Sequence, residues 1–498
     1  RGFSANNTGA GNTAVGFRAL KTNTTGTRNT ALGYGAYTAS DTENDNLAIG
    51  YNALSDNTQG GTRNVAIGNY ALDALTSADD CVAVGYASQT TTTTGVNNTS
   101  LGAYSLDLLT SGDSNTAIGK DALTTNATGH NNVAVGMNAL GANLATANVA
   151  VGKDALAANT TGTENTAMGH EALKTMTTTE GQTAIGYKAL EVSVGNYNTA
   201  VGVESMNDAT GAGNCTAVGY HALRLLTTGA QNTALGMQAL YSNTDGVRNL
   251  AIGYNAYSSS NSEGDNIAIG FDAMTTNTAG GNFNVVVGNY AGDAITSADN
   301  TTCLGHISGG AITTGISNTC LGAGAGLYIT SGANNLMIGL DAGHSNSPGG
   351  SITTASNTIT LGNNQIGTCN IQTDWTVASD KRDKTDIEPV KIGLDFVNKL
   401  EPVTYHWDKR SNYAMNEKLD GAHKEAWTDI GFLAQDVEKL ENEYGHKLED
   451  KSNLTFRRSE DDAYGLTYTK FVPILTKAIQ ELSAQNADLL ARIETLEG

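Results

Sequence analysis

Hydrophobic residues recur along the first 362 residues at an interval of about 17 positions. In each unit a short alternating segment of the type Asn-Thr-Ala-Val-Gly is followed by an Ala-Leu pair, as in Ala19-Leu20. A loop rich in Thr, Asn and Gly then leads to the next unit. A fixed period of this kind is typical of stacked repeat architectures. The pattern therefore predicts an all-β solenoid or β-roll shaft over residues 1–362, with about twenty coils.

One glycine marks each unit and sets the register of the repeat. These glycines are Gly16, Gly33, Gly50, Gly68, Gly85, Gly102, Gly119, Gly136, Gly152, Gly169, Gly186, Gly202, Gly219, Gly236, Gly253, Gly270, Gly288, Gly305, Gly322 and Gly339, and a last copy ends at Gly362. A longer repeat is also present, since residues 33–102 reappear at 253–322 with an offset of 220. Repeat proteins tolerate such block duplication because each coil contacts only its neighbours.

The alternation within each strand predicts which side chains face the interior. The residue before the glycine is aliphatic in every unit, and the residue two positions earlier is Thr, Val, Leu or Ile. Residues two apart share one face of a strand. We expect this pair, including the strand Thr, to point into the coil, and the intervening Ala to lie against a neighbour.

Asn occupies the position four before the glycine in sixteen of the first twenty units. Asn suits turns because its amide bonds nearby backbone groups, and one Asn per coil predicts a ladder rather than a set of ligand sites. A coil of 17 residues has room for only three or four core side chains. We therefore expect a bundle of three chains, a homotrimer, rather than a lone solenoid.

The composition changes after the last repeat. Residues 363–378 are expected to form a linker, and residues 379–498 a small α+β domain in which Lys, Arg and Trp are concentrated. Residues 468–498 carry heptads and predict a helical coiled coil. One core position holds Val472, Ile479, Asn486 and Ile493, and the other holds Leu475, Leu482, Leu489 and Leu496. An amphipathic helix packed on its own domain is the alternative, and the heptads alone favour two strands over three.

Four motifs of the last 120 residues carry a family resemblance. They are Ser379–Ile387, Leu400–Trp407, Ile430–Val437 and Tyr468–Leu482. In this order they resemble the intramolecular chaperone domain of phage tailspikes and endosialidases, the peptidase S74 family. The shaft units, such as Asn46-Leu-Ala-Ile-Gly50, resemble the head repeats of trimeric autotransporter adhesins and the repeats of phage tail fibres. The C-terminal resemblance implies a domain that trimerises three chains and then cuts itself off.

The same resemblance implies a Ser-Lys pair as the catalytic machinery. Ser379 and Lys384 match that pair, and the expected cut is the Ala378–Ser379 bond. A Ser hydroxyl becomes a nucleophile when a base such as a neutral Lys takes its proton. We expect a single-turnover self-cleavage and no activity on other substrates. Whether this copy still cuts itself stays open at this point.

Charge and cysteine content exclude other classes of function. The net charge of -21 disfavours nucleic acid as a partner, because such binding requires Lys and Arg against phosphates. No apolar run is long enough for membrane insertion. The five cysteines lack CxxC spacing, and no metal or cofactor is expected. Cys303 and Cys320 lie 17 apart, so they are either a disulfide or, the favoured alternative, two buried small residues.

Together these patterns predict a structural virion fibre, a tail fibre or spike shaft for host attachment. Its partners are expected to be a host cell-surface receptor, a glycan or a surface protein, and other virion tail proteins bound through an N-terminal part that precedes this fragment. The expected location is the virion. The alternatives are a cellular trimeric adhesin at the cell surface and a fragment of a polysaccharide-degrading tailspike.

Overall fold

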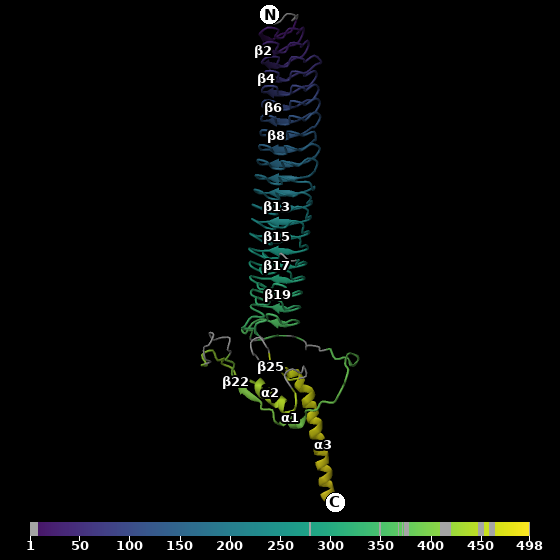
Figure 1. The fold of residues 1–498 in the computed structure, drawn as a ribbon, viewed down its shortest axis with the longest axis vertical. Coiled ribbons are helices and arrows are strands. Elements are labelled where there is room, and N and C mark those ends of the chain that lie inside the picture. The colour runs from purple at the N-terminus through teal and green to yellow at the C-terminus, as the bar shows by residue number, and fades with distance from the viewer. Residues whose placement is uncertain are drawn as a thin grey trace. The chain divides into compact units, whose positions relative to one another are not determined.

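The computed structural model describes residues 8–277, 280–347, 350–366, 368–370, 372, 378–408, 420–446, 453–457 and 464–497. The chain divides into two units, Arg1–Thr319 and Cys320–Gly498. The first unit is a β-solenoid with one short strand per coil (Figure 1). The second unit holds the last coils and then a small domain of a few short strands and three α-helices.

Every strand of the solenoid has three residues. The strands are β1 (Thr13–Val15), β2 (Thr30–Leu32), β3 (Leu47–Ile49), β4 (Val65–Ile67), β5 (Val82–Val84), β6 (Thr99–Leu101), β7 (Thr116–Ile118), β8 (Val133–Val135), β9 (Val149–Val151), β10 (Thr166–Met168), β11 (Thr183–Ile185), β12 (Thr199–Val201), β13 (Thr216–Val218), β14 (Thr233–Leu235), β15 (Leu250–Ile252), β16 (Ile267–Ile269), β17 (Val285–Val287), β18 (Thr302–Leu304), β19 (Thr319–Leu321), β20 (Leu336–Ile338) and β21 (Ile359–Leu361). The predicted β-solenoid of 17-residue coils is confirmed.

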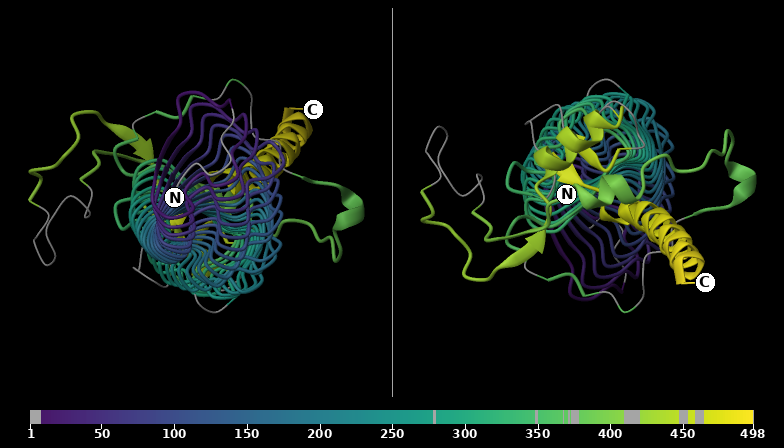
Figure 2. Two further views of the ribbon diagram at one scale, coloured as in Figure 1. Left: turned by 90° about the horizontal axis from the view of Figure 1, so that it is seen from above. Right: turned by 90° about the horizontal axis from the view of Figure 1, so that it is seen from below.

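Consecutive strands of the first unit pair in parallel with equivalent residues opposite one another. Thr13, Ala14 and Val15 of β1 face Thr30, Ala31 and Leu32 of β2, and the same register continues from coil to coil. Viewed along the stack, the coils overlie one another with a progressive offset (Figure 2). Each coil is therefore a copy of the last, and the interior is a set of columns.

The marker glycine of each coil is required by its backbone and by its neighbour. Gly219 has φ +137°, a conformation that side chains disfavour. A Cβ atom built on Gly219 lies 2.5 Å from the carbonyl oxygen of Gly236 in the next coil. The same clash recurs along the column, so the coils approach each other too closely for any side chain at this position.

The expected direction of the strand side chains is wrong. In β2 the central Ala31 is fully buried, whereas Leu32 is 45% exposed and Thr30 is half-buried. The same pattern holds in β7 to β16, so Ala faces the interior and the Thr and aliphatic residues face outward. The reason is the width of the coil. Its interior already holds an Ala-Leu pair from the opposite wall, which leaves room only for a methyl group.

In most coils the large core residue after the Ala sits in a left-handed backbone conformation. Leu123 has φ 51° and Leu240 has φ 52°, and both are fully buried. This conformation costs a non-glycine residue roughly 1–2 kcal/mol. Burial of the Leu side chain stabilises the fold by about 1.5–3 kcal/mol, which offsets that cost.

We call the position of this Leu, four residues after the marker glycine, the corner. In four late coils the corner holds Gly, and a larger residue takes the place of Ala in the strand. Gly292 and Gly309 replace the corner Leu, and Val286 and Cys303 replace the strand Ala. A Cβ atom on Gly309 overlaps the Sγ atom of Cys303. The two positions thus share one volume, which either of them fills. The coils of Cys320 with Gly326 and Met337 with Gly343 follow the same rule.

The second unit ends the solenoid with one long coil, since Leu336 of β20 pairs with Ile359 of β21. Its remaining elements are η1 (Lys381–Asp383), α1 (Leu394–Asn398), β22 (Val403–Tyr405), β23 (Asp429–Gly431), α2 (Ala434–Glu443), β24 (Thr455–Arg457), β25 (Tyr464–Leu466), η3 (Tyr468–Lys470) and α3 (Phe471–Glu497). β22 pairs antiparallel with β23, and β24 with β25. The core of this domain joins α1, α2 and the first turns of α3, and its buried members are Ile392, Phe396, Val437, Leu440, Leu454, Phe471 and Ile474.

Candidate functional site

Ser379 and Lys384 lie at the two ends of a single tight turn. Asp380 caps the 3-10 helix η1 (Lys381–Asp383), because its carboxylate accepts a hydrogen bond from the backbone N–H of Arg382 at 2.9 Å. This turn folds the chain back on itself over five residues. The Lys384 Nζ atom consequently lies 2.6 Å from the Ser379 Oγ atom and donates a hydrogen bond to it. A Ser hydroxyl and a Lys amine at this distance are in reach for proton transfer.

The charges around this pair are arranged locally. The Arg382 guanidinium donates to both carboxylate oxygens of Asp380, to Oδ1 at 3.1 Å and to Oδ2 at 2.6 Å, and holds the pKa of that carboxyl below its usual range. Asp380 is thereby engaged by an internal partner. Ala378, Ser379 and Lys384 are all exposed in the single chain. The peptide bond that precedes Ser379 is therefore accessible. The Ser379 hydroxyl lies on the C-terminal side of this bond and is hydrogen-bonded to the Lys384 amine.

The heptad positions of α3 form an exposed apolar face. Among them Ile479 is 67% exposed and Leu496 is 86% exposed. The first turns of the helix pack on their own domain through a different face, with Phe471, Ile474 and Ala478 buried. Glu481 lies beside these and its carboxylate accepts a hydrogen bond from the N–H of Leu394 at 2.8 Å, at the start of α1.

We call the apolar face of α3 the seam. Its members are Val472, Leu475, Ile479, Leu482, Asn486, Leu489, Ile493 and Leu496, of which the seven apolar side chains are each at least two-fifths exposed. The helix packs on its own domain through Phe471, Ile474 and Ala478, and the seam residues are left exposed in the single chain.

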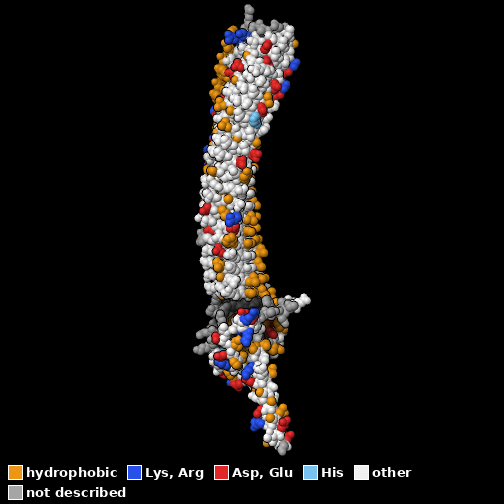
Figure 3. Space-filling view, turned by 90° about the vertical axis from the view of Figure 1, so that its right-hand side faces the viewer, with side chains coloured by type: hydrophobic (Ala, Val, Ile, Leu, Met, Phe, Trp, Pro, Cys, Tyr) orange, Lys and Arg blue, Asp and Glu red, His pale blue; other side chains and the backbone are white. Residues whose placement is uncertain are grey.

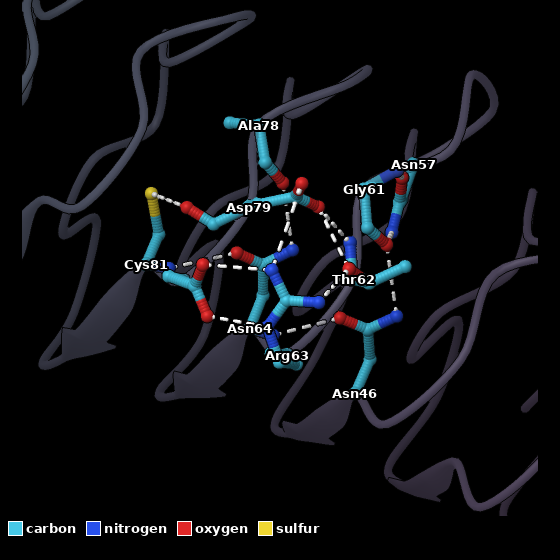
Figure 4. A network of polar contacts seen from close by, with 10 residues as sticks. Asn46, Asn57, Gly61, Thr62, Arg63, Asn64, Ala78, Asp79 and Cys81 are labelled. Carbon is cyan, nitrogen blue, oxygen red and sulfur yellow. Dashed lines mark hydrogen bonds and ion pairs between the residues drawn. The ribbon is translucent and has the colours of Figure 1, made fainter.

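The recurring Asn residues are structural side chains of the shaft (Figure 4). Asn64 is fully buried, and its Oδ1 atom accepts a hydrogen bond from the N–H of Cys81 in the next coil at 2.9 Å. Its Nδ2 group donates to the carbonyl oxygen of Ala78 at 2.9 Å, and its own N–H donates to Asn46 Oδ1 at 2.9 Å. Both ends of the amide are occupied, so this column joins coils and binds nothing else.

Two cysteines replace Asn in that column. Cys215 is buried, and its Sγ atom donates to the carbonyl oxygen of Gly229 at 3.4 Å and accepts from the N–H of Asn232 at 3.4 Å. Burial raises the pKa of the Cys81 thiol to about 11, so it stays protonated and donates to Gly95. Cys303 and Cys320 are buried and are not joined by a disulfide, as the favoured alternative predicted.

One cluster that sequence reasoning missed combines Asp154, His170 and Glu171, whose ligand atoms lie within 4.8 Å of one another. These residues lie in adjacent coils, and only the coil register brings them together. Lys174 binds Glu171 at 2.6 Å, and Lys153 binds Asp154 at 3.2 Å. The carboxylates therefore already have cationic partners, and we assign no metal to this cluster.

The comparisons with known proteins agree with the C-terminal resemblance. Residues 379–446 match the family model described as the chaperone of endosialidase, peptidase S74. The match begins at Ser379, the residue of the candidate pair that follows the expected cut. The class defined by fold and match is thus a long β-solenoid followed by a chaperone-of-endosialidase domain. This combination fits a protein of the phage tail fibre or spike type.

A search among curated proteins found no significant match to the chain. In the part of the chain that the structure describes, no helix has both the length and the apolar character that crossing a bilayer requires.

Proposed function

We propose that this chain is the shaft of a trimeric virion fibre whose C-terminal domain aligns three copies and then releases itself. The observation that carries the proposal is the Ser379–Lys384 pair at 2.6 Å, located where the family match begins. The shaft then remains as the part that reaches a receptor on the host surface, either a glycan or a protein. Many weak contacts along three identical shafts add up to firm attachment.

The proposed cleavage follows from the geometry of the turn. In its neutral form the Lys384 amine takes the proton of the Ser379 hydroxyl, and the oxygen attacks the carbonyl carbon of Ala378. The bond from that carbon to the Ser379 nitrogen breaks, and the nitrogen receives the proton from Lys384. Water then hydrolyses the resulting ester, which leaves a carboxylate on Ala378 and restores the hydroxyl of Ser379. Water is the only further reactant that the cleavage needs.

Mass spectrometry of the purified full chain tests this cleavage. The wild-type chain is expected to yield one fragment that ends at Ala378 and one that begins at Ser379. Ser379→Ala and Lys384→Met are expected to leave the 51.4-kDa chain intact. Lys381→Met is the matched control, because it removes a neighbouring exposed amine that does not contact Ser379. A wild-type chain that stays as intact as Ser379→Ala contradicts the proposal.

Trimerisation is supported by the seam of α3, which the parent domain leaves exposed. Leu482→Lys with Leu489→Lys places charges in the seam, and light scattering is expected to report loss of the three-chain species. The matched control is Ala484→Lys with Ala491→Lys, which adds the same charges at exposed positions of the same helix outside the seam. Equal masses for the two variants contradict the proposed role of the seam.

A further inference from the structure

The outward side of the solenoid strands forms a second apolar surface, and it runs through all coils of the first unit. We call it the strand face and define it by three positions per coil, namely the third and the first residue before the marker glycine and the residue after it. Its exposed members include Leu32, Leu101, Met168 and Leu304. Figure 3 shows hydrophobic side chains gathered in a band along the shaft.

Aromatic rings line one edge of the strand face. They follow the glycine in many coils and contact each other from coil to coil, as Tyr34 and Tyr51 do with ring centroids 5.3 Å apart. The run from Phe17 to Tyr104 is continuous over six coils, and in two of them the ring, Tyr70 or Tyr104, stands two residues after the glycine and borders the strand face. Five of these six rings are about two-fifths to one-half exposed and Tyr70 is half-buried, so the contacts within the chain leave a large part of most rings uncovered.

The strand face is also free of acidic groups. No Asp or Glu stands at any of its three positions, although the chain has 49 acidic residues and a net charge of -21. Its only charged residues are Lys120 and Lys153. The acidic residues stand elsewhere on the coil, as Asp45 and Asp265 do at a corner where each pairs with an Arg. The strand face itself therefore brings no carboxylate into a contact with another acidic chain.

The size of the strand face exceeds what a monomer ordinarily exposes. If each exposed apolar side chain leaves on the order of 60–100 Å² accessible, the coils of the first unit present on the order of 2,000 Å². The largest apolar patch of a typical monomer is roughly 300–600 Å². A standard interface takes roughly 800 Å² from each partner. The strand face is thus large enough for a stable contact with another macromolecule.

We propose that the strand face is the surface by which copies of this chain pack against one another in parallel. A parallel copy has the same coil spacing, so its aliphatic and aromatic columns meet their equivalents in every coil. The seam of α3 imposes the same parallel direction at the C-terminus. The position before the glycine is aliphatic throughout and offers no hydrogen-bonding group, whereas the strand Thr and Tyr residues carry hydroxyl groups. A glycan is therefore the competing occupant that the test below separates. This inference rests on the proposed trimer and names its shaft interface.

Cysteine cross-linking of the full chain tests the contact. Val218→Cys places a thiol on the strand face, where the native residue is 38% exposed. Thr210→Cys places one in an exposed loop of the same coil. Both variants carry Cys369→Ser, which removes the exposed native thiol. With a short bismaleimide, Val218→Cys is expected to give a two-chain band on a denaturing gel in more than half of the material, and Thr210→Cys to stay single.

The outcomes separate the two proposals. If the wild-type chain has the mass of three chains but Val218→Cys does not cross-link, the strand-face contact is overturned while the trimer stands. If the wild-type chain has the mass of one chain, both are overturned. A second variant, Met168→Glu with Ile185→Glu and Val218→Glu, is expected to lower the melting temperature of the shaft by more than 5 °C. The loop variant Thr161→Glu with Thr178→Glu and Thr210→Glu adds the same charge and is expected to change it by less than 2 °C.

A glycan role is tested with the same variants. If the wild-type chain binds a host-surface oligosaccharide and the Glu variant of the strand face loses that binding with its mass unchanged, the face is a glycan site and the packing proposal fails.

Discussion

At the scale of the residue, the shaft depends on a few positions where the backbone of the next coil restricts the side chain. The marker glycine is the strictest of them, since both its φ and the carbonyl group of the next coil exclude a Cβ atom. The Asn of the ladder is the second, because its amide bonds two buried backbone groups, one carbonyl oxygen and one N–H, that would otherwise have no partner. Cys81 and Cys215 satisfy the same groups with a thiol, at longer distances.

The first prediction concerns the glycine column. Gly219→Ala is expected to destabilise the shaft by more than about 3 kcal/mol, because it adds both backbone strain and overlap with Gly236. Gly60→Ala is the matched control, since Gly60 has φ +103° but no atom within 4 Å of its built Cβ. It is expected to cost only the strain, about 1–2 kcal/mol. Urea unfolding followed by circular dichroism measures both, and equal losses contradict the role of the close approach.

The second prediction concerns Cys81 at alkaline pH. Burial raises the pKa of its thiol from 9.0 to about 11, so the folded state resists ionisation that the unfolded chain undergoes. Its contribution to stability is complete below pH 9 and is lost as the pH rises towards 11, by up to about 3 kcal/mol. Cys81→Asn restores the ladder residue and removes this ionisation. The urea midpoint of this variant is expected to fall less between pH 8 and pH 10.5 than that of the wild type.

Cys369→Ser is the control for the alkaline experiment, because Cys369 is exposed. Its urea midpoint is expected to follow the wild type at both pH values. A Cys81→Asn variant with the same alkaline loss as the wild type contradicts the assignment to this thiol.

At the scale of the element, the coil is a fixed volume that two positions share. Where the strand has Ala the corner has a long side chain, most often Leu, and where the strand has Cys303 the corner has Gly309. The sequence shows both substitutions, but their connection is visible only once the corner and the strand lie on opposite walls. The direction of the strand was predicted wrongly for the same reason. Alternation identifies two faces, and the width of the coil decides which one is inside.

The third prediction follows from this shared volume. Gly309→Leu alone is expected to destabilise the shaft by about 2–3 kcal/mol because the new side chain overlaps Cys303. Cys303→Ala alone leaves a cavity and is expected to cost about 1 kcal/mol. The double variant recreates the common coil, and its loss is expected to be smaller than that of Gly309→Leu. A thermal-melt double-mutant cycle measures the coupling, and additive losses contradict it.

The candidate cleavage site was also predictable in part, since its residues, but not their geometry, could be read from the sequence. The spacing of Ser379 and Lys384 was available from the motif, and the family match agrees with the domain in which it lies. The 2.6 Å approach comes from a turn that Asp380 caps, which the motif alone does not specify. The seam was predicted from heptads, and the structure adds that it lies apart from the buried face of α3.

At the scale of the whole molecule, the shaft is one-dimensional, since the strands of the first unit pair with their sequence neighbours. The period was therefore predictable from the marker glycines alone, without any long-range contact. The strand face was not predictable as an exposed surface, because that required the direction of every strand. Stability in such a stack is approximately a sum of coils and of contacts between adjacent coils.

The fourth prediction tests this additivity. Deletion of residues 204–220 removes one 17-residue unit and joins Val203 to His221 in the same register. The shortened chain is expected to fold and to melt within about 3 °C of the wild type, because the columns remain continuous. Deletion of residues 204–211 removes less sequence but shifts every later column. It is expected to melt at least 10 °C lower or to accumulate in inclusion bodies, and a normal melt contradicts the columnar model.

The in-register columns give the chain an unusual way to change its length. Residues 33–102 recur at 253–322, and the offset of 220 residues corresponds to close to thirteen coils. At about 4.8 Å per paired strand, thirteen added coils lengthen a shaft by roughly 60 Å. No new interface is needed, because the two copies stand at the same phase of the repeat. Unequal recombination at any pair of equivalent codons has the same effect. The length of the shaft therefore changes in steps of whole coils.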